Sequence, residues 1–212
     1  MNDAIENPEG FVLIGGASSR MGSDKAQLTL GGRKLFERSA FALSVVCPNR
    51  IALVGSVGSN FVGDLPVIGD IRIETGDHVR APIVGLYTAL ATAKAAWVAI
   101  LACDLPFVTG DLMNSLAGYC SDQWDAVVPV QPDARPQPLC AFYRRGSCLA
   151  VTETMIKSGH LKMQDLVSRL ATRFVEFEEL ADLDGSADFF CNVNSPKDYE
   201  HVVAKQGMLD AK

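Results

Sequence analysis

Residues 11–25 read FVLIGGASSRMGSDK, a short apolar run that passes directly into a loop rich in glycine and serine. A continuous apolar run of this length is typical of a strand buried on both faces, and such strands form parallel sheets that helices cover. In open α/β sheets, ligands bind where the carboxyl ends of the strands meet the loops that follow them. The segment therefore predicts an α/β fold with a ligand site immediately after its first strand.

The apolar pattern of this first strand recurs along the first 130 residues. Three further runs have the same character: RIALVG at 50–55, WVAILACD at 97–104 and DAVVPV at 125–130. Segments of helical period lie between the runs, at 34–46, at 83–94 and, after a Thr109 cap, at 111–119. This alternation is the βαβ pattern of a mostly parallel sheet covered by helices.

The pattern changes after residue 130. The sequence predicts a strand at 138–145 (PLCAFYRR), helices near 147–158 and 161–171, a strand at 173–179 (RFVEFEE) and a last helix after Pro196. Proline suits the first turn of a helix, where its missing N–H is not needed for a helical hydrogen bond. Because no repeat, low-complexity tract or linker interrupts the chain, we expect one domain over residues 1–212.

The composition limits the class of protein. With 212 residues, 48% of them hydrophobic, the chain can bury about 70% of its unfolded surface, enough for one domain. The six cysteines include no CxxC pair, which favours small buried thiols in a reducing compartment. A net charge of −6 disfavours nucleic acid as a partner. Without a signal-like or bilayer-spanning run, we expect a cytoplasmic protein with no membrane partner.

The glycine-rich loop has the residues of an anion-binding turn. Gly15, Gly16 and Gly22 let the backbone bend tightly, and the amide groups of such a turn bind anions. Arg20 and Lys25 add a bidentate guanidinium and a mobile ammonium, which together suit a triphosphate. The absence of GxxxxGK(S/T) and GxGxxG disfavours the P-loop and dinucleotide-binding folds. The alternative, a solvated surface turn, is disfavoured by the position of the loop directly after a buried strand.

A carboxylate follows the most apolar run of the chain. Asp104 ends WVAILACD, and Pro106 stops the strand two residues later. A carboxylate oxygen fixed on a rigid strand suits Mg²⁺, which usually takes one or two protein carboxylates and completes its shell with phosphate and water. The alternative role for Asp104 is an Asx turn at the end of the strand.

These residues carry a resemblance to a known family. LIGGASSRMGSDKAQLTLGGRKL resembles the signature loop of the molybdenum cofactor guanylyltransferases, a branch of the nucleotidyltransferases. Further matches follow in order along the chain: VIGD at 67–70, APIVGLYTAL at 81–90, ACDLPFV at 102–108, QPLCAFYRR at 137–145 and FFCNVNSPKDYE at 189–200. The resemblance implies a three-layer, Rossmann-like nucleotidyltransferase fold with a mostly parallel central sheet.

The resemblance also implies an activity. In this family, GMP is transferred from GTP to the terminal phosphate of the molybdenum-molybdopterin cofactor, giving the guanine dinucleotide cofactor and pyrophosphate, with Mg²⁺. A phosphate monoester is largely a dianion at neutral pH because its second pKa is about 6, so the attacking group needs no general base. Residues 1–130 would form the nucleotide-binding half and residues 131–212 the acceptor-binding half. The resemblance also implies protein partners, namely proteins that insert the cofactor and proteins that take part in molybdoenzyme maturation.

The resemblance assigns roles to particular residues. Those implied to be catalytic are Arg20, Lys25 and Asp104, with Asp104 as the metal ligand. Those implied to bind the nucleotide, the metal ion or the acceptor are Leu13, Ile14, Gly15, Gly16, Lys25, Asp70, Asp104, Asn192 and Asn194.

Some of these assignments leave alternatives open. Asp77 lies in an apparent insertion and competes with Asp70 for the nucleotide. Asn192 and Asn194 alternate with Val193, so both amides would point to one face of a strand; the alternative is an asparagine-rich turn before the last helix.

The choice of nucleotide rests on Gly15. Related cytidylyltransferases commonly have alanine there, and a backbone without a Cβ can approach a larger purine, which favours GTP. Where the family has a nucleotide-binding asparagine after the second strand, this chain departs from the pattern with Gly55, Ser56 and Val57. The alternative functions are a related cytidylyl- or sugar-phosphate nucleotidyltransferase and a non-catalytic nucleotide-binding module in cofactor delivery.

Overall fold

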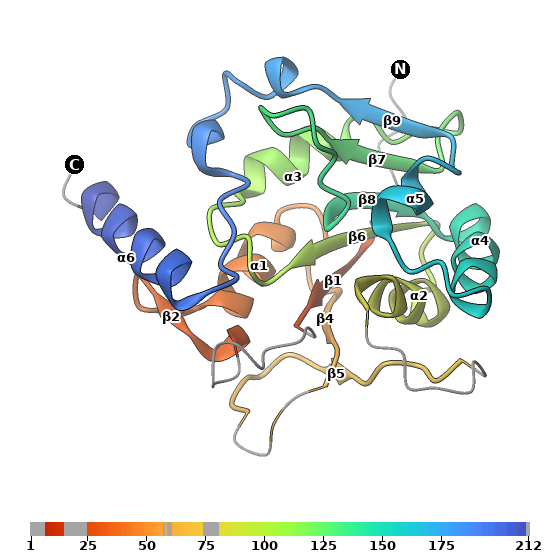
Figure 1. Ribbon diagram of the computed structural model, residues 1–212, viewed down its shortest axis with the longest axis horizontal. Helices are drawn as coiled ribbons and strands as arrows, with labels where there is room; N and C mark the ends of the chain where they lie inside the picture. Colours follow the sequence, from red (N-terminus) through yellow and green to blue (C-terminus); the bar gives the residue numbers. More distant parts are fainter. Residues whose placement is uncertain (1–6, 15–24, 57, 59–60, 74–80, 211–212) are drawn as a thin grey trace.

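The computed structural model of the chain describes residues 7–14, 25–56, 58, 61–73 and 81–210. Within these residues a seven-stranded sheet runs through the middle of the molecule in the order β5-β4-β1-β6-β8-β7-β9 (Figure 1). Its strands are β1 (Glu9–Leu13), β4 (Ile51–Val54), β5 (Val67–Ile68), β6 (Trp97–Ala102), β7 (Ala126–Pro129), β8 (Cys140–Arg144) and β9 (Thr172–Val175). Neighbouring strands are parallel except where β8 pairs with β6 and β7, so the predicted mostly parallel sheet is confirmed.

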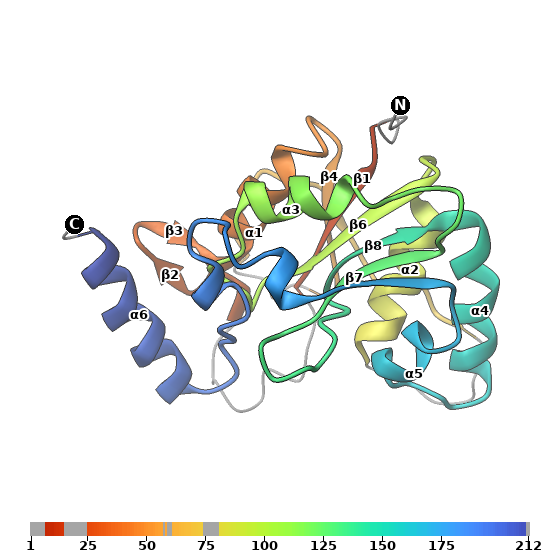
Figure 2. The ribbon, with the colours of Figure 1, turned by 90° about the horizontal axis from the view of Figure 1, so that it is seen from above.

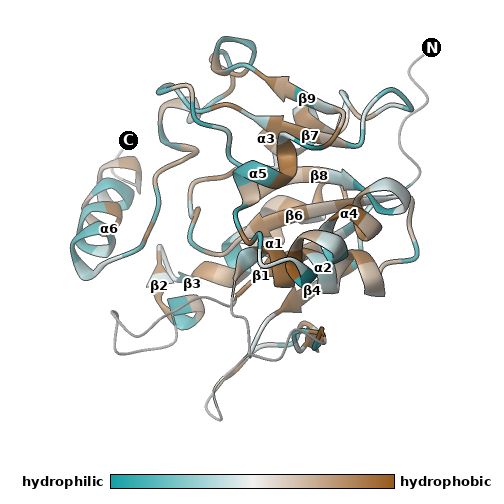
Figure 3. Cartoon of the chain, turned by 45° about the vertical axis from the view of Figure 1, so that its right-hand side comes forward, coloured by the Kyte–Doolittle hydropathy of each residue, from teal (hydrophilic) through white to brown (hydrophobic). Residues whose placement is uncertain are grey.

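Helices cover both faces of the sheet and complete the three predicted layers (Figure 2). One face packs against α1 (Leu35–Ser44) and α3 (Gly110–Ala117), and the other against α2 (Pro82–Thr92), α4 (Arg145–Lys157) and α5 (Met163–Val167). All six residues of β6 are buried, and from Trp97 to Leu101 its side chains alternate between two core clusters, one on each face of the sheet. The continuous apolar run of β6 is therefore explained by burial on both faces. Figure 3 shows the same concentration of hydrophobic residues along the central strands.

A smaller unit lies beside the three layers. The hairpin of β2 (Thr29–Leu30) and β3 (Arg33–Lys34) turns through two glycines, Gly31 and Gly32, with φ of 58° and 77°. The last helix, α6 (Pro196–Asp210), lies against this hairpin, and the Tyr199 hydroxyl donates a 2.5 Å hydrogen bond to the Thr29 carbonyl. This contact brings the end of the chain next to the segment that follows the glycine-rich loop (Figure 1).

Two expectations for the second half of the chain need correction. The strand expected at 173–179 ends at Val175, and Phe177–Glu179 form a 3₁₀-helix instead. A capping box explains the change, since the Glu176 amide donates to the Glu179 carboxylate at 2.9 Å. The helix expected at 161–171 is shorter, at Met163–Val167. No helix in the described part of the chain is both long enough and apolar enough to cross a membrane.

The predicted cap of α3 is confirmed and gives a stability test. The Thr109 hydroxyl accepts a 3.2 Å hydrogen bond from the Leu112 amide. We expect Thr109→Ala to lower the free energy of unfolding by about 1 kcal/mol, because the cap pairs an amide that has no helical partner. Urea unfolding checks this, with the exposed Thr154→Ala of α4 as the control. Equal stability of the Thr109→Ala and wild-type proteins would show that the cap contributes nothing.

Candidate active site

The carboxyl ends of four parallel strands meet at one edge of the sheet. Backbone hydrogen bonds continue just past the strands there: Ile14 N donates to the Val54 carbonyl at 2.9 Å, Gly55 N to Ile68 at 3.0 Å and Cys103 N to Leu13 at 3.1 Å. Asp104 follows β6 at this edge and Asp70 follows β5. Side chains that are distant in the sequence therefore line one edge, where open α/β sheets bind ligands.

Lys25 and Asp104 form an ion pair at this edge. Lys25 begins the 3₁₀-helix η2 (Lys25–Gln27), which is held in place by the fully buried Ala26. Its ammonium donates to the Asp104 carboxylate with an Nζ–Oδ2 distance of 2.9 Å. The two side chains are only 16% and 20% exposed, so solvent and salt screen this pair less than a surface pair.

Asn194 joins the pair from the far end of the chain. Its Oδ1 accepts a hydrogen bond from Lys25 Nζ at 3.1 Å, across 169 residues of sequence. The buried Val193 fixes this approach, because its amide donates to the Asp104 carbonyl at 2.9 Å. The structure thus brings together three residues expected at the site, Lys25, Asp104 and Asn194.

The segment that carries Asn194 is not the expected strand. Val193 is buried while Asn192 and Asn194 are exposed, so the alternation of faces is correct. However, the segment has no regular secondary structure and is held by the Val193–Asp104 hydrogen bond rather than by a ladder. Asn192 is exposed two residues before Asn194, which is the asparagine that accepts the hydrogen bond from Lys25.

Asp198 supports the site and was missed by the sequence analysis. Its carboxylate accepts hydrogen bonds from the amides of Asn194 at 2.9 Å and Ser195 at 2.8 Å, while the Ser195 hydroxyl accepts from the Asp198 amide at 3.2 Å. The Asn194 amide, followed by the Ser195 contacts and the nearby charge of Lys25, holds the pKa of Asp198 below its ordinary value. The signal in the sequence was Ser195 three residues before an acidic residue, a capping-box pattern.

Asp70 lies at the same edge, apart from the ion pair. It is exposed just after β5, and the Ile71 amide that follows it donates to the Thr88 hydroxyl at 2.9 Å. In the strand order, β5 is three steps from β6, or roughly 14 Å at about 4.8 Å per step. An extended ligand such as a nucleoside triphosphate is suited to span this distance.

The remaining expected residues divide into two groups. Leu13 and Ile14 are described, and their side chains lie in the two core clusters, so only their backbone groups face the edge. Gly15, Gly16 and Arg20 lie outside the described residues, as does Asp77, the alternative to Asp70.

The donor set fits a metal ion that arrives with phosphates. In the parts of the chain that the structure describes, no three His, Cys, Asp or Glu side chains gather as a metal-binding group. Asp104 supplies one carboxylate at a partly exposed position, which suits Mg²⁺ because this ion usually keeps phosphate and water ligands.

Four of the cysteines are too deeply buried to act as nucleophiles. Burial raises the pKa of Cys47, Cys140 and Cys148 to about 12, and it also raises that of Cys120. A thiol must ionise to act as a nucleophile, so these side chains are neutral packing groups at physiological pH. Their interpretation as small buried side chains is confirmed, and five of the six are buried.

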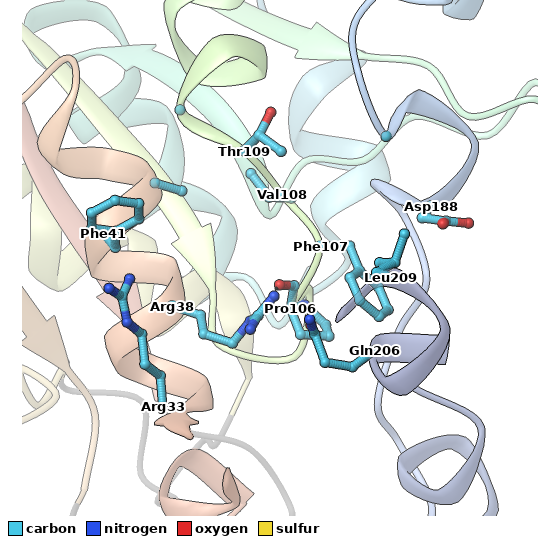
Figure 4. A pocket seen from close by; sticks show the side chains of 13 residues that line it. Arg33, Arg38, Phe41, Pro106, Phe107, Val108, Thr109, Asp188, Gln206 and Leu209 are labelled. Atoms are coloured by element: carbon cyan, nitrogen blue, oxygen red, sulfur yellow. Dashed lines mark hydrogen bonds between the residues drawn. The ribbon is translucent and has the colours of Figure 1, made fainter. Parts of the chain in front are cut away.

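A separate cavity of about 340 Å³ lies between α1, the segment after Asp104 and α6 (Figure 4). Its lining includes Arg33, Phe41, Phe107 and Leu209, and none of Lys25, Asp70, Asp104 and Asn194. The Arg33 guanidinium lies over the Phe41 ring, 4.6 Å from its centre. The cavity is therefore not the site formed at the sheet edge.

The chain is similar to known proteins along most of its length. Residues 10–173 match the model of a family described as the MobA-like NTP transferase domain. The chain is 32% identical over 199 residues to a probable molybdenum cofactor guanylyltransferase of Carboxydothermus hydrogenoformans, covering 94% of this chain and 96% of that protein. It is 28% identical over 196 residues to the molybdenum cofactor guanylyltransferase of Desulfosudis oleivorans, covering 92% and 94%.

Solved structures show the same fold. The crystal structure of molybdopterin-guanine dinucleotide biosynthesis protein A from Archaeoglobus fulgidus superposes with a TM-score of 0.76 at 25% identity, covering 94% of this chain and 99% of that chain. A 2-C-methyl-D-erythritol 4-phosphate cytidylyltransferase from Thermus thermophilus superposes with a TM-score of 0.67 at 18% identity, covering 95% and 100%. The second likeness concerns the fold alone.

Proposed function

Because this chain belongs to the MobA-like NTP transferase family, we propose that it transfers GMP from GTP to the terminal phosphate of the molybdopterin cofactor and releases pyrophosphate. The observation that carries the proposal is the cluster of Lys25, Asp104 and Asn194 at the carboxyl edge of the sheet. It combines a mobile cation, a fixed carboxylate and an amide from the second half of the chain. These groups are suited to bind a triphosphate, a metal ion and an acceptor side by side.

Lys25 and Asp104 change partners when the nucleotide binds. A lysine ammonium is a point charge on a flexible stem, so Lys25 can turn from Asp104 toward the phosphates without a movement of the backbone. Asp104 is then the residue that holds the metal ion, which we propose to be Mg²⁺. When bound, Mg²⁺ stabilises negative charge on the phosphoryl group and on the departing pyrophosphate. Lys25 adds a positive charge aimed at the same oxygens.

The glycine-rich loop completes the triphosphate site. The backbone amides of Gly15 and Gly16 and the guanidinium of Arg20 would bind phosphate oxygens, in line with the anion-binding character of such turns. Leu13 and Ile14 would contribute backbone groups, because their side chains are buried. Asp70 would contact the base at the other end of the nucleotide.

We assign the acceptor to the second half of the same domain. Asn194 and the exposed Asn192 come from residues 131–212 and flank Val193, whose amide donates to the Asp104 carbonyl of the nucleotide half. An acceptor phosphate held there would lie near the nucleotide phosphates, since Asn194 contacts the Lys25 ammonium that we propose binds them. The acceptor phosphate is largely dianionic at neutral pH, so positioning replaces a general base.

The choice of GTP is tested with a nucleotide series. Guanine has N–H groups at N1 and N2 that can donate hydrogen bonds to the Asp70 carboxylate, whereas adenine has a hydrogen-bond acceptor at N1. We expect kcat/KM for GTP to exceed that for ATP by roughly ten- to a hundredfold, because each unpaired buried polar group costs about 1–3 kcal/mol. Pyrophosphate release with GTP, ATP and CTP, each with molybdopterin, measures the ratio.

Two variants locate the source of this preference. Asp70→Asn should reduce the GTP/ATP ratio, while Asp64→Asn, at another exposed aspartate near β5, should leave it unchanged. Equal or better use of CTP by the wild-type protein would contradict the guanylyl assignment and favour a cytidylyltransferase. Nucleotide binding with no pyrophosphate release in the presence of any acceptor would favour a binding module.

A further inference from the structure

A buried hydroxyl on α2 ties this helix to the segment after β5. Thr88 has no exposed surface, and its Oγ1 donates to the Val84 carbonyl at 2.9 Å within the helix. The same oxygen accepts a 2.9 Å hydrogen bond from the amide of Ile71. The Thr88 hydroxyl therefore makes two hydrogen bonds, one within its own helix and one to the backbone of a segment outside the helix.

The segment held by Thr88 has little other regular structure. β5 has two residues and lies at the edge of the sheet, and residues 69–73 after it belong to no helix or strand. Ile73 packs partly against the core cluster that contains the inner side of α2. The hydrogen bond to Ile71 is therefore a directional contact that sets where the backbone beside Asp70 lies.

We propose that Thr88 is a positioning residue for base selection, because it holds the Ile71 amide and so fixes the Asp70 carboxylate beside the nucleotide base. This inference rests on the proposed function, in which Asp70 accepts hydrogen bonds from guanine. Thr88 touches neither substrate nor metal ion. It acts through the backbone between residues 70 and 71.

The physical reason is the sensitivity of hydrogen bonds to geometry. N–H···O contacts weaken steeply when the donor–acceptor distance leaves about 2.7–3.2 Å or the angle falls toward 120°. A carboxylate that accepts two donors from one base edge must keep both distances at once. If the Ile71 amide loses its buried acceptor, residue 70 takes up a wider range of positions, and the contact that separates guanine from adenine weakens first.

The chain offers a matched control for the removal of this hydroxyl. Thr152 of α4 is also completely buried, and its Oγ1 donates to the Cys148 carbonyl four residues earlier, at 2.7 Å. Thr88→Val and Thr152→Val therefore remove the same hydrogen bond within a helix. Of the two, Thr88→Val alone removes the acceptor of the Ile71 amide.

The experiment measures kcat and KM for GTP and ATP, by pyrophosphate release with molybdopterin, in the wild type and the single variants. We expect Thr88→Val to lower the GTP/ATP ratio of kcat/KM by roughly five- to tenfold, mainly through a higher KM for GTP, the loss that one weakened hydrogen bond produces. Thr88→Ser, which keeps the hydroxyl, should have the same GTP/ATP ratio as the wild type. Thr152→Val should lower stability without changing the ratio. If Thr88→Val does not fold, Thr88→Ala removes the same oxygen with less crowding.

A double variant separates this inference from the proposed function. In an Asp70→Asn background, Thr88→Val should change the GTP/ATP ratio no further, because its effect passes through Asp70. A wild-type ratio in Thr88→Val, or an effect that adds fully to that of Asp70→Asn, would overturn the role of Thr88 while leaving the proposed function standing. A wild-type protein with no preference for GTP would instead contradict the proposed function itself.

Discussion

Replacing Asp104 with asparagine is expected to lower kcat by more than about two orders of magnitude and to leave the fold intact. The change removes one charged oxygen ligand from a metal ion that supplies several kcal/mol of charge stabilisation. It also removes the charge attraction with Lys25, but asparagine keeps a side-chain oxygen that can accept the Lys25 hydrogen bond, so little change in folding is expected. The loss should therefore appear in turnover and not in folding.

The Asp104→Asn result is measured as steady-state pyrophosphate release, with urea unfolding of the same samples. Asp111→Asn is the matched control, because Asp111 is an exposed aspartate in the first turn of α3, seven residues further along the chain. We expect the control to keep wild-type turnover. Wild-type turnover in a folded Asp104→Asn protein would show that Asp104 does not hold the metal ion.

Replacing Lys25 with alanine is expected to raise the KM for GTP and to lower kcat as well. The ammonium binds the triphosphate in the ground state and also stabilises the charge that develops on departing pyrophosphate. A hydrogen bond to a charged group contributes about 1.5–3 kcal/mol, which corresponds to a loss of roughly ten- to a hundredfold in kcat/KM.

The matched control for Lys25→Ala is Lys157→Ala, which removes an exposed lysine paired with Glu153 on α4. This control should leave both kinetic parameters unchanged. A rise in KM at constant kcat would restrict Lys25 to ground-state binding. Unchanged kinetics in Lys25→Ala would show that its contact with Asp104 is only a structural ion pair.

The sequence predicts the central sheet well because burial on both faces leaves a strong signal. β6 is apolar at every position, and the structure buries every one of its residues. The Thr109 cap was also predictable, since capping depends on residues only three apart. Local patterns of this kind need no knowledge of the tertiary structure.

Two elements that the sequence did not predict correctly also have physical explanations. The segment RFVEFEE was predicted to be a strand to residue 179, but the capping box of Glu176 and Glu179 ends the strand at Val175. The hairpin of β2 and β3 was missed because its strands have two residues each and its turn depends on two glycines with positive φ. Short elements carry too few residues for a periodic pattern.

The site was predictable in its chemistry but not in its arrangement. Family motifs identified Lys25, Asp104 and Asn194, while their contact depends on the packing of α6 and the buried Val193 beside the hairpin. Asp198 and Thr88 act on backbone amides at the site edge and have no catalytic pattern of their own. Such supporting residues appear only when the hydrogen bonds between distant segments are known.

In the proposed reaction, the α-phosphoryl group of GTP, with its nucleoside, passes to the acceptor. This transfer is tested most directly by incubating the protein with Mg²⁺, molybdopterin and GTP that carries radioactive phosphorus at either the α- or the γ-position. We expect the α-label to appear in a molybdopterin dinucleotide product and the γ-label to leave as pyrophosphate, and we expect both to depend on molybdopterin. Transfer of the γ-label to the acceptor, or release of pyrophosphate at the same rate without molybdopterin, would contradict this reaction.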